Sequence, residues 1–517
     1  MSDFLNLPPE ILIAILHSLD LSSLVACIAT NRRVKSIIDG SASLQYRLAT
    51  QAACVEDNPY GATNMTSADR LRALRKRQIA FAELLPSSIS TIQMDKISFL
   101  HTYTFSGGIL ALTESTEQSL RWISLASIGQ SSPVWERLEL DEYILEIILA
   151  VPEEDLLVVL SSTSSLHGHP PPTGAVLKLR FYEISTGSAH RNAQDPVIIV
   201  PMDVVGRPSF HVDICGPRVS VMMEIFNDTV EQRGRLLVYN WKQGQLQMDL
   251  VDNYSAAVFL STEIILLAQE TGGILQLWAI PDVPERIAGP RISLKLPRLP
   301  NHHEYYIVRA EYNPKGNHTP ASRQPFHSSL VHSLVILNIA RLHLDDDDKS
   351  ARFRLVIPRR ALLEQFSSGQ NHGEERSWAD WGPFIGRWFA ASAFPDGWPS
   401  ITCGQRCILL TPDRHILLLD FNPYTWKRTL LEKARRNGIA AIPATDQFVF
   451  VPSSELDVGD ELAWLGEQVH SRLGYVAKKS RKTTNWDSVM IDEEWIVGVK
   501  DTIELDGKLA FEVWHFG

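Results

Sequence analysis

The feature that most constrains the fold is a change of sequence pattern near residue 90. Beyond it, short runs rich in Val, Ile, Leu and aromatic residues alternate with clusters of Gly, Pro, Asp, Asn and Ser. Runs of this composition and length are typical of β-strands separated by tight turns. They include residues 119–125, 144–150, 156–161, 175–184, 197–200, 219–226, 235–241, 263–268, 274–280, 330–339, 353–357, 407–410, 415–421, 495–499 and 509–516. Helical spacing returns only briefly, at 360–366 and 430–437, so the pattern predicts a large all-β region.

A loose repeat runs through this region. Several strands end in an aromatic residue followed by a turn, at 179–187, 237–244, 275–280, 415–421 and 511–514. A unit of about 40–60 residues that ends in such a strand suits a propeller blade, whose four strands pack on neighbouring blades. The region is similar to a degenerate WD-type propeller, although it has no strict Gly-His to Trp-Asp signature. We expect about six to eight blades, with a pair of β-sandwiches as the alternative fold.

The chain before residue 90 has a helical pattern. Pro8 and Pro9 suit the first turn of a helix, where a backbone N–H has no intrahelical partner. Apolar residues then recur on one helix face, and Asp20 with Ser22 and Ser23 supplies a break and a new N-cap. Three such short helices bury little surface, yet they carry more large aliphatic residues than so small a bundle can hide. The surplus predicts a surface that packs on a partner or, alternatively, a helical cap on the rest of the chain.

The N-terminal sequence resembles an F-box. The run from Leu7 to Leu24, followed by Asn31-Arg32-Arg33-Val34, has the register of that motif, although an aromatic residue is more usual where Val34 stands. The segments 44–46, 57–60 and 69–77 also resemble mushroom-type fungal F-box proteins. The resemblance implies binding to a Skp-type adaptor and, through it, to a cullin-based ubiquitin ligase. The residues that it assigns to adaptor binding are Leu7, Pro8, Glu10, Ile11, Leu12, Ile15, Leu16, Leu19 and Leu24.

These patterns divide the chain into an F-box over residues 1–45, a helical linker over 46–88 and a propeller-like domain over 89–517. The linker ends in a helix whose apolar residues alternate with cations, namely Arg70, Arg72, Arg75, Lys76 and Arg77. We interpret these cations as the solvated face of an amphipathic helix, with a grip on an acidic partner as the alternative. The helix would set the distance and angle between the adaptor end and the propeller.

Composition and charge argue against several classes of protein. The chain has 49 basic and 60 acidic residues and a formal net charge of −11, which argues against a general nucleic-acid binder. Its 5 cysteines are too few for a secreted disulfide framework. The N-terminus has neither the basic region of a signal peptide nor an uninterrupted apolar span, so we expect no membrane segment. These observations predict a reduced intracellular compartment, the cytoplasm or the nucleus.

No residue pattern points to catalysis, a cofactor or a metal ion. Cys403 and Cys407 lack a second ligand pair at finger-like spacing, so we expect two buried thiols. The histidines at 167, 169, 302 and 303 lack zinc-binding spacing, and the acidic run 345–349 lacks the spaced ligands of a calcium loop. The glycine pairs at 107–108 and 272–273 are typical of hairpin turns.

Two further segments have two interpretations each. Residues 367–399 are dense in aromatic side chains, which either fill the core between late blades or form an exposed recognition surface. The basic tract 478–482 is either a nuclear address or a solvated loop.

The sequence therefore predicts a substrate-recruiting subunit of a Skp-cullin-F-box ubiquitin ligase, in which loops at the top of the propeller bind a client protein. Such a subunit acts through proximity, because it holds a client lysine near a loaded ubiquitin carrier. One alternative is a scaffold that uses the same adaptor without ubiquitin transfer. Another is a propeller enzyme, which would need a polar central pocket where carboxylates or histidines converge.

Overall fold

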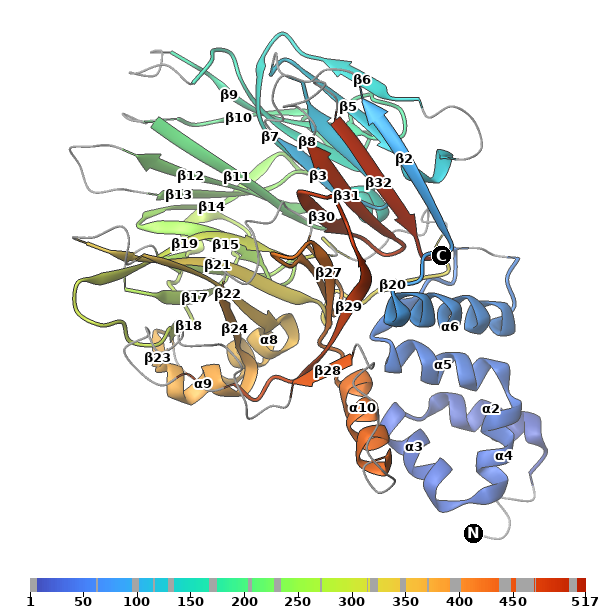
Figure 1. Ribbon diagram of the computed structural model, residues 1–517. Helices are drawn as coiled ribbons and strands as arrows, with labels where there is room; N and C mark the ends of the chain where they lie inside the picture. The colour runs from blue at the N-terminus through green and yellow to red at the C-terminus, as the bar shows by residue number, and fades with distance from the viewer. Residues whose placement is uncertain are drawn as a thin grey trace.

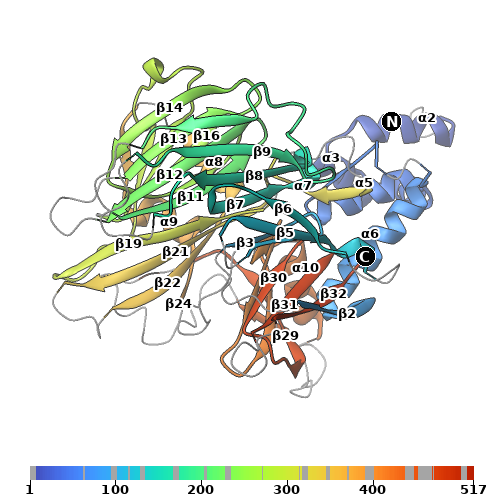
Figure 2. The same cartoon turned by 90° about the horizontal axis from the view of Figure 1, so that it is seen from above.

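The computed structural model describes residues 7–61, 64–94, 102–114, 117–128, 134–166, 174–202, 207–226, 234–269, 272–313, 315–316, 324–344, 350–369, 372–390, 401–436, 448–451, 469, 471–501 and 509–517. Within these ranges, N-terminal helices precede seven β-sheets of four or five strands, arranged around a common axis as the blades of a propeller (Figure 1). The protein is mainly β, as predicted, and the seven blades lie within the expected range. Because the sheets surround one axis instead of stacking in pairs (Figure 2), the β-sandwich alternative is wrong.

The blades follow one another along the chain. Blades 1 and 2 contain β3 (Tyr103–Ser106), β4 (Ile109–Thr113), β5 (Ser119–Ser124) and β6 (Glu136–Glu139), then β7 (Tyr143–Ala150), β8 (Leu156–Ser162), β9 (Leu177–Glu183) and β10 (Val197–Val200). Blade 3 contains β11 (Arg207–Cys215), β12 (Arg218–Phe226), β13 (Gly234–Asn240) and β14 (Gln245–Asp252). Blade 4 contains β15 (Tyr254–Phe259), β16 (Ile264–Gln269), β17 (Ile274–Ala279) and β18 (Ile292–Lys295), to which β23 (Glu374–Arg376) adds in parallel.

The later blades carry the insertions. Blade 5 contains β19 (His303–Glu311), β21 (Leu334–His343), β22 (Ala351–Pro358) and β24 (Arg387–Ala390). Blade 6 contains β25 (Thr402–Cys403), β26 (Arg406–Leu410), β27 (His415–Asp420), β29 (Tyr475–Thr483) and, at its edge, β28 (Phe448–Val451). Blade 7 contains β30 (Ser488–Ile491), β31 (Trp495–Asp501), β32 (Leu509–His515) and β2 (Ser88–Met94). Short helices lie between strands: η1 (Leu125–Ser127), α7 (Val151–Glu154), η2 (Pro284–Arg286), α8 (Arg359–Ser368), α9 (Trp378–Ile385) and α10 (Pro423–Arg436).

The ring closes by pairing the two ends of the β region. β2 runs antiparallel to β32 from Ser88 opposite His515 to Met94 opposite Leu509, so the N-terminal strand is the outermost strand of the last blade. Closure of this kind leaves no break in the ring where a blade could slide against its neighbour.

The recurring aromatic strand is the third of its blade. β9, β13, β17, β27 and β32 all occupy this position, and a fourth strand follows each of them in its sheet. The prediction that the repeat unit ends in this strand is therefore wrong, although the repeat does mark one strand per blade. Each predicted strand run overlaps a strand of the structure, and the two glycine pairs form hairpin turns with positive φ.

The aromatic-rich segment after residue 366 divides between the two interpretations. Trp378, Trp381 and Trp388 are buried and contact one another, Trp378 and Trp381 with ring centroids 4.9 Å apart. Phe384, in contrast, is 51% exposed. The aromatic residues at 394 and 398 lie outside the described residues. The core interpretation is thus confirmed for the three tryptophans.

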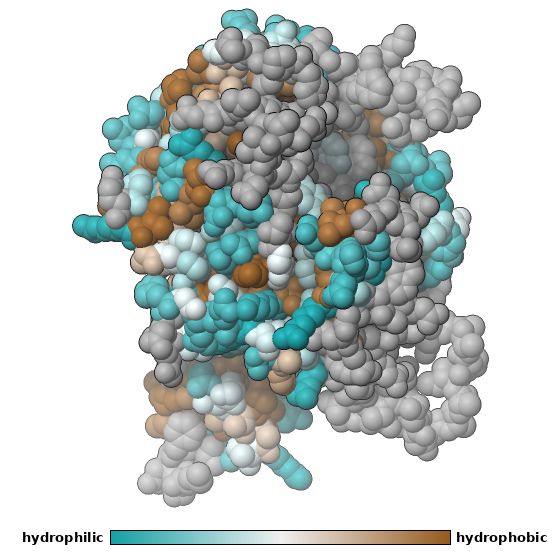
Figure 3. Space-filling model, turned by 90° about the vertical axis from the view of Figure 1, so that its left-hand side faces the viewer, coloured by the Kyte–Doolittle hydropathy of each residue, from teal (hydrophilic) through white to brown (hydrophobic). Residues whose placement is uncertain are grey.

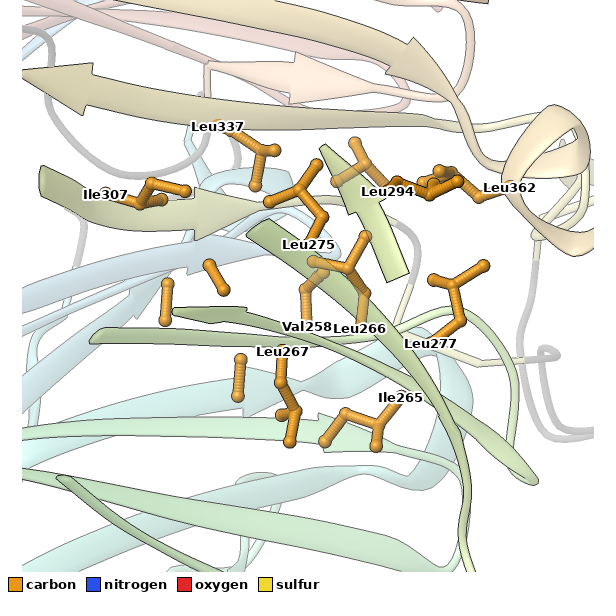
Figure 4. Packing of buried hydrophobic residues seen from close by; sticks show 14 of the residues in the cluster. Val258, Ile265, Leu266, Leu267, Leu275, Leu277, Leu294, Ile307, Leu337 and Leu362 are labelled. Carbon is orange, nitrogen blue, oxygen red and sulfur yellow. The ribbon is translucent and has the colours of Figure 1, made fainter. Parts of the chain in front are cut away.

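The largest apolar cluster of the described residues spans blades 3, 4 and 5, and Figure 4 shows part of it. Leu266 and Leu275 of blade 4 point toward Leu337 of blade 5, and Leu362 of α8 covers one end. All four side chains are fully buried. Burying a leucine contributes about 1.5–3 kcal/mol, so such contacts between flat blade faces are the main force that holds the ring together.

Replacing Gly498 by alanine should destabilise the propeller. A β-carbon there would lie 1.9 Å from the ring of Trp486, which is itself fully buried. Because the ring has no space to move into, we expect a loss of about 1–3 kcal/mol in the free energy of unfolding. Gly40→Ala is the control, since nothing lies within 4 Å of its added carbon. Thermal unfolding followed by circular dichroism would measure both variants, and equal melting temperatures would contradict the prediction.

Candidate functional site

The N-terminal helices are stabilised by capping residues that directly precede them in the sequence. They are α2 (Pro9–Ser18), α3 (Leu21–Thr30), α4 (Arg32–Gly40) and α5 (Ala42–Ala52). Asp20 caps α3 by accepting a hydrogen bond from the Ser23 backbone N–H at 2.8 Å. Hydrogen bonds from the Ser22 hydroxyl and from Ser23 lower the pKa of Asp20 to about 2. Asn31 caps α4 in the same way.

The predicted adaptor-binding residues divide into two groups. Leu12, Leu16 and Leu24 are at most 1% exposed, and the latter two pack with Leu44 in the core of the helical group. They therefore support the surface of this group from beneath. The others are exposed or partly exposed, namely Leu7, Pro8, Glu10, Ile11, Ile15 and Leu19.

The exposed apolar side chains of these helices were only partly predicted. Ile11 on α2 and Val25 on α3 are each 49% exposed. Val25 was not predicted, although its spacing from Leu21 and Ile28 on one helix could have indicated it. Figure 3 shows apolar side chains gathered at the foot of the molecule, where Figure 1 places these helices, the part of the chain farthest from the propeller. An apolar surface at this position is available to a partner.

The linker helix α6 (Ser67–Glu83) is more deeply buried than the sequence suggested. Arg70 is 7% exposed and Arg77 is 2% exposed, whereas Arg72, Arg75 and Lys76 face solvent. The interpretation of all five cations as a solvated face is therefore wrong for two of them. Both buried arginines lie on the side of the helix that meets the propeller.

A small two-stranded sheet joins the helices to the propeller. β1 (Val55–Asp57) pairs with β20 (Phe326–Ser328), which belongs to the connection between β19 and β21 of blade 5. Arg70 fastens this sheet, because its guanidinium donates to Asp57 at 2.9 Å and to the backbone carbonyls of Asn58 and Pro325 at 2.8 and 3.0 Å. Each strand has only three residues, so the hydrogen bonds from Arg70 supplement the few backbone hydrogen bonds between them.

Farther along α6 the contacts become part of the propeller core. Arg77 forms an ion pair with Glu493 at 3.4 Å and lies 4.2 Å above the ring of Phe326. Phe81 stacks on Phe516 with ring centroids 4.3 Å apart, and Arg406 covers its ring. Phe81 is fully buried within the apolar cluster that blades 6 and 7 share. We name the contacts of α6 and β1 with the propeller the joint.

The connection between β19 and β21, which carries β20, contacts turns of blades 2 and 3. Its Lys315 receives the backbone N–H of Gly216 on its carbonyl, donates its own backbone N–H to Glu153, and places its ammonium 2.9 Å from Asp213. Tyr312 of the same connection donates to the carbonyl of Ile214 at 2.7 Å. The turns between first and second strands of several blades thus meet this connection at the end of the axis where the joint lies.

A cavity of about 50 Å³ lies on the axis, lined by the first strands of several blades. Glu146, His211, Glu311 and Lys315 are among its lining residues. Carboxylates and a histidine do converge here, as a propeller enzyme would require. The volume, however, suits a few water molecules and is far below the ~300–1,000 Å³ of ordinary ligand pockets.

The described residues contain no candidate metal site and no candidate membrane-spanning helix. No group of three or more His, Cys, Asp or Glu side chains is arranged to bind a metal ion there. Cys403 and Cys407 are buried thiols, as predicted, and burial raises the pKa of Cys407 to about 12. No helix in this part of the chain combines the length and apolar character needed to cross a bilayer. The histidines at 167 and 169 and the acidic run 345–349 lie outside the described residues.

The solvated-loop interpretation of the basic tract 478–482 is wrong, because the tract forms part of strand β29. Lys478 is 6% exposed and lies 3.3 Å from Glu83 of α6, while Lys479 pairs with Asp413 at 2.6 Å. Its first cations therefore serve the joint and blade 6.

The N-terminal helices have a small core of their own, and their sequence matches a known family. Residues 4–51 match the F-box-like family. F-box domains generally bind Skp-type adaptors, and an F-box-like domain followed by a propeller fits a substrate receptor of the adaptor type. No curated protein matches the chain.

Solved structures give only distant likenesses. Sqt1 from Chaetomium thermophilum is 12% identical with a TM-score of 0.33, over 81% of this chain and 83% of that one. The uncharacterized protein lmo1340 from Listeria monocytogenes EGD-e is 8% identical with a TM-score of 0.34, over 65% and 82%. A luciferin-regenerating enzyme is 7% identical with a TM-score of 0.29, over 78% and 100%. At these scores the likenesses carry no argument about function.

Proposed function

We propose that this protein is the substrate-recruiting subunit of a Skp-cullin-F-box ubiquitin ligase in the cytoplasm or nucleus. The F-box-like domain binds a Skp-type adaptor, and through it a cullin, while the propeller binds a client protein. The observation that carries the proposal is the match of residues 4–51, together with the exposed apolar side chains Ile11 on α2 and Val25 on α3. The chain itself performs no catalysis and needs no cofactor in this role.

Geometry suggests where the client binds. The turns between first and second strands lie at the end of the axis where the joint lies. Gly108 there contacts blade 7, and Glu493 contacts β20. Because neighbouring strands are antiparallel, the connections between second and third strands lie at the opposite end of the axis. That end is not covered by α6 or β1, so we place client binding there. The receptor then binds its adaptor and its client at opposite ends.

Co-expression with a Skp-type adaptor, followed by size-exclusion chromatography, tests the proposal directly. We expect a stable one-to-one complex. If both proteins fold and elute separately, the helices are only a cap on the propeller and the proposal fails. A complex that forms but transfers no ubiquitin to any client in a reconstituted ligase would favour a scaffold instead.

Two sets of variants define the adaptor surface. Leu7→Ala combined with Pro8→Ala should abolish adaptor capture and leave the circular dichroism of the propeller unchanged. Ile11→Asp should weaken binding by about tenfold or more, because it places a charge in an apolar contact. Ile199→Asp is its matched control, since Ile199 is 57% exposed on β10 of blade 2. Wild-type adaptor capture by the Leu7 and Pro8 variant would overturn the assignment of this surface.

A further inference from the structure

We propose that Arg47 is a positioning residue of the adaptor-binding surface, because its guanidinium binds the junction between α2 and α3. These two helices carry the exposed apolar side chains Ile11 and Val25. Arg47 itself lies on α5, outside both helices, and its side chain is partly buried. This role rests on the proposed function, since it concerns the surface to which the adaptor binds.

The guanidinium of Arg47 binds three backbone carbonyls at the junction. Its Nη1 donates to the carbonyl of Leu16 at 3.3 Å and to that of His17 at 2.5 Å, both in the last turn of α2. Its Nη2 donates to the carbonyl of Leu19, the residue that precedes the N-cap of α3. Carbonyls at the C-terminus of a helix have no partner within the helix and carry partial negative charge, so a cation stabilises them.

The junction is short, so its conformation determines the angle between the two helices. Only Leu19 and Asp20 connect α2 to α3, and both have extended backbone angles. The apolar core beneath the helices also holds them together, but apolar contacts are not directional, whereas hydrogen bonds are. The hydrogen bonds from Arg47 therefore keep Ile11 and Val25 in one arrangement relative to each other.

The helix that carries Arg47 is itself held in place. α5 lies between α6 and α2 (Figure 1). Tyr46, next to Arg47 in the chain, is 6% exposed and donates to Asp57 of β1 at 2.7 Å. The last carbonyl of α5, that of Ala52, accepts the side-chain amide of Asn422 at 2.8 Å. Because α5 is bound to the joint and to the propeller, Arg47 fixes α2 and α3 against a rigid support.

The chemistry of the contact requires an arginine. A guanidinium is planar and has donors on separate nitrogen atoms, so it can bind several carbonyls at once, whereas the ammonium of a lysine is a single point of charge. Arg47→Lys should therefore keep the charge and part of the hydrogen bonding. Arg47→Met keeps the apolar stem of the side chain and removes every donor.

Adaptor affinity of the full chain, measured by isothermal titration calorimetry, tests the inference. Arg47→Met should weaken binding by about tenfold or more, as expected if the binding arrangement of α2 and α3 is populated only about one-tenth of the time. Arg47→Lys should lie between this variant and the wild type. Arg75→Met is the matched control and should bind normally, because Arg75 of α6 donates to Gln45 of α5 at 3.1 Å instead of to the junction. Wild-type affinity in Arg47→Met would overturn the inference.

Hydrogen exchange of the same chains without the adaptor separates positioning from unfolding. Arg47→Met should lower the protection of α2 and α3 and leave that of α5 unchanged, because only the junction loses its hydrogen bonds. Equal losses in all three helices would show that Arg47 merely keeps the helical group folded, and would overturn the role. If Arg47→Met does not fold, Arg47→Lys should show the same pattern with a smaller loss.

The two proposals fail in different ways. A wild-type chain that folds and binds no adaptor would overturn the proposed function, and the role of Arg47 with it. A wild-type chain that binds the adaptor, beside an Arg47→Met variant that binds it equally well, would overturn the role of Arg47 alone.

Discussion

Replacing Arg77 by alanine is expected to lower the free energy of unfolding by about 3–5 kcal/mol. The change removes the cation from the buried carboxylate of Glu493 and the guanidinium from the ring of Phe326. A buried charge that loses its counter-charge keeps the cost of dehydration without the compensating attraction. Urea denaturation followed by tryptophan fluorescence would measure the loss.

Two matched variants separate this effect from a general loss of positive charge. Arg72→Ala removes a cation of the same helix that is 77% exposed and pairs with Asp69, so it should cost less than about 1 kcal/mol. Arg77→Met combined with Glu493→Gln should recover most of the stability, because it removes both buried charges and keeps an acceptor for Ser328. Equal losses for Arg77→Ala and Arg72→Ala would show that Arg77 does not hold the joint.

The second large effect is expected from Phe81→Ala, at about 3–5 kcal/mol. The ring is fully buried, stacks on Phe516 and fills space between blades 6 and 7, so its removal leaves a cavity that the rigid strands cannot close. Ile79→Ala on the same helix is the control, because Ile79 is 64% exposed and should change stability by less than about 0.5 kcal/mol. A negligible loss at Phe81 would mean that α6 is only an external linker.

The elements that the sequence predicts correctly are those determined by residues close to one another in the chain. The break between α2 and α3 depends on Asp20, whose side chain caps the helix that follows it directly. Strands such as β8, β12 and β16 follow from composition and turns, and the third strand of several blades follows from its aromatic end. These signals are local, so one sequence is enough to recognise them.

The joint could not be predicted in the same way. β1 has three residues, and its partner β20 is inserted within blade 5, so neither carries a strand pattern of useful length. In the sequence, Arg77 cannot be distinguished from the exposed cations of α6. It packs against Glu493 and Phe326, which lie hundreds of positions away in the chain. Local pattern describes how much charge a helix carries, whereas tertiary packing decides which charges are covered.

The pairing of β2 with β32 has a consequence for synthesis on the ribosome. Ser87 and His515, which are hydrogen-bonded at the edge of this pair, are 428 positions apart, so the first strand emerges long before its partner exists. At about 5–20 residues per second, the interval is roughly 20 to 90 s. During that time the F-box-like helices can fold, but β2 offers an unpaired backbone edge that invites aggregation. Nascent chains should therefore depend on chaperones until translation ends, and variants that slow closure should reduce the yield of protein more than its final stability.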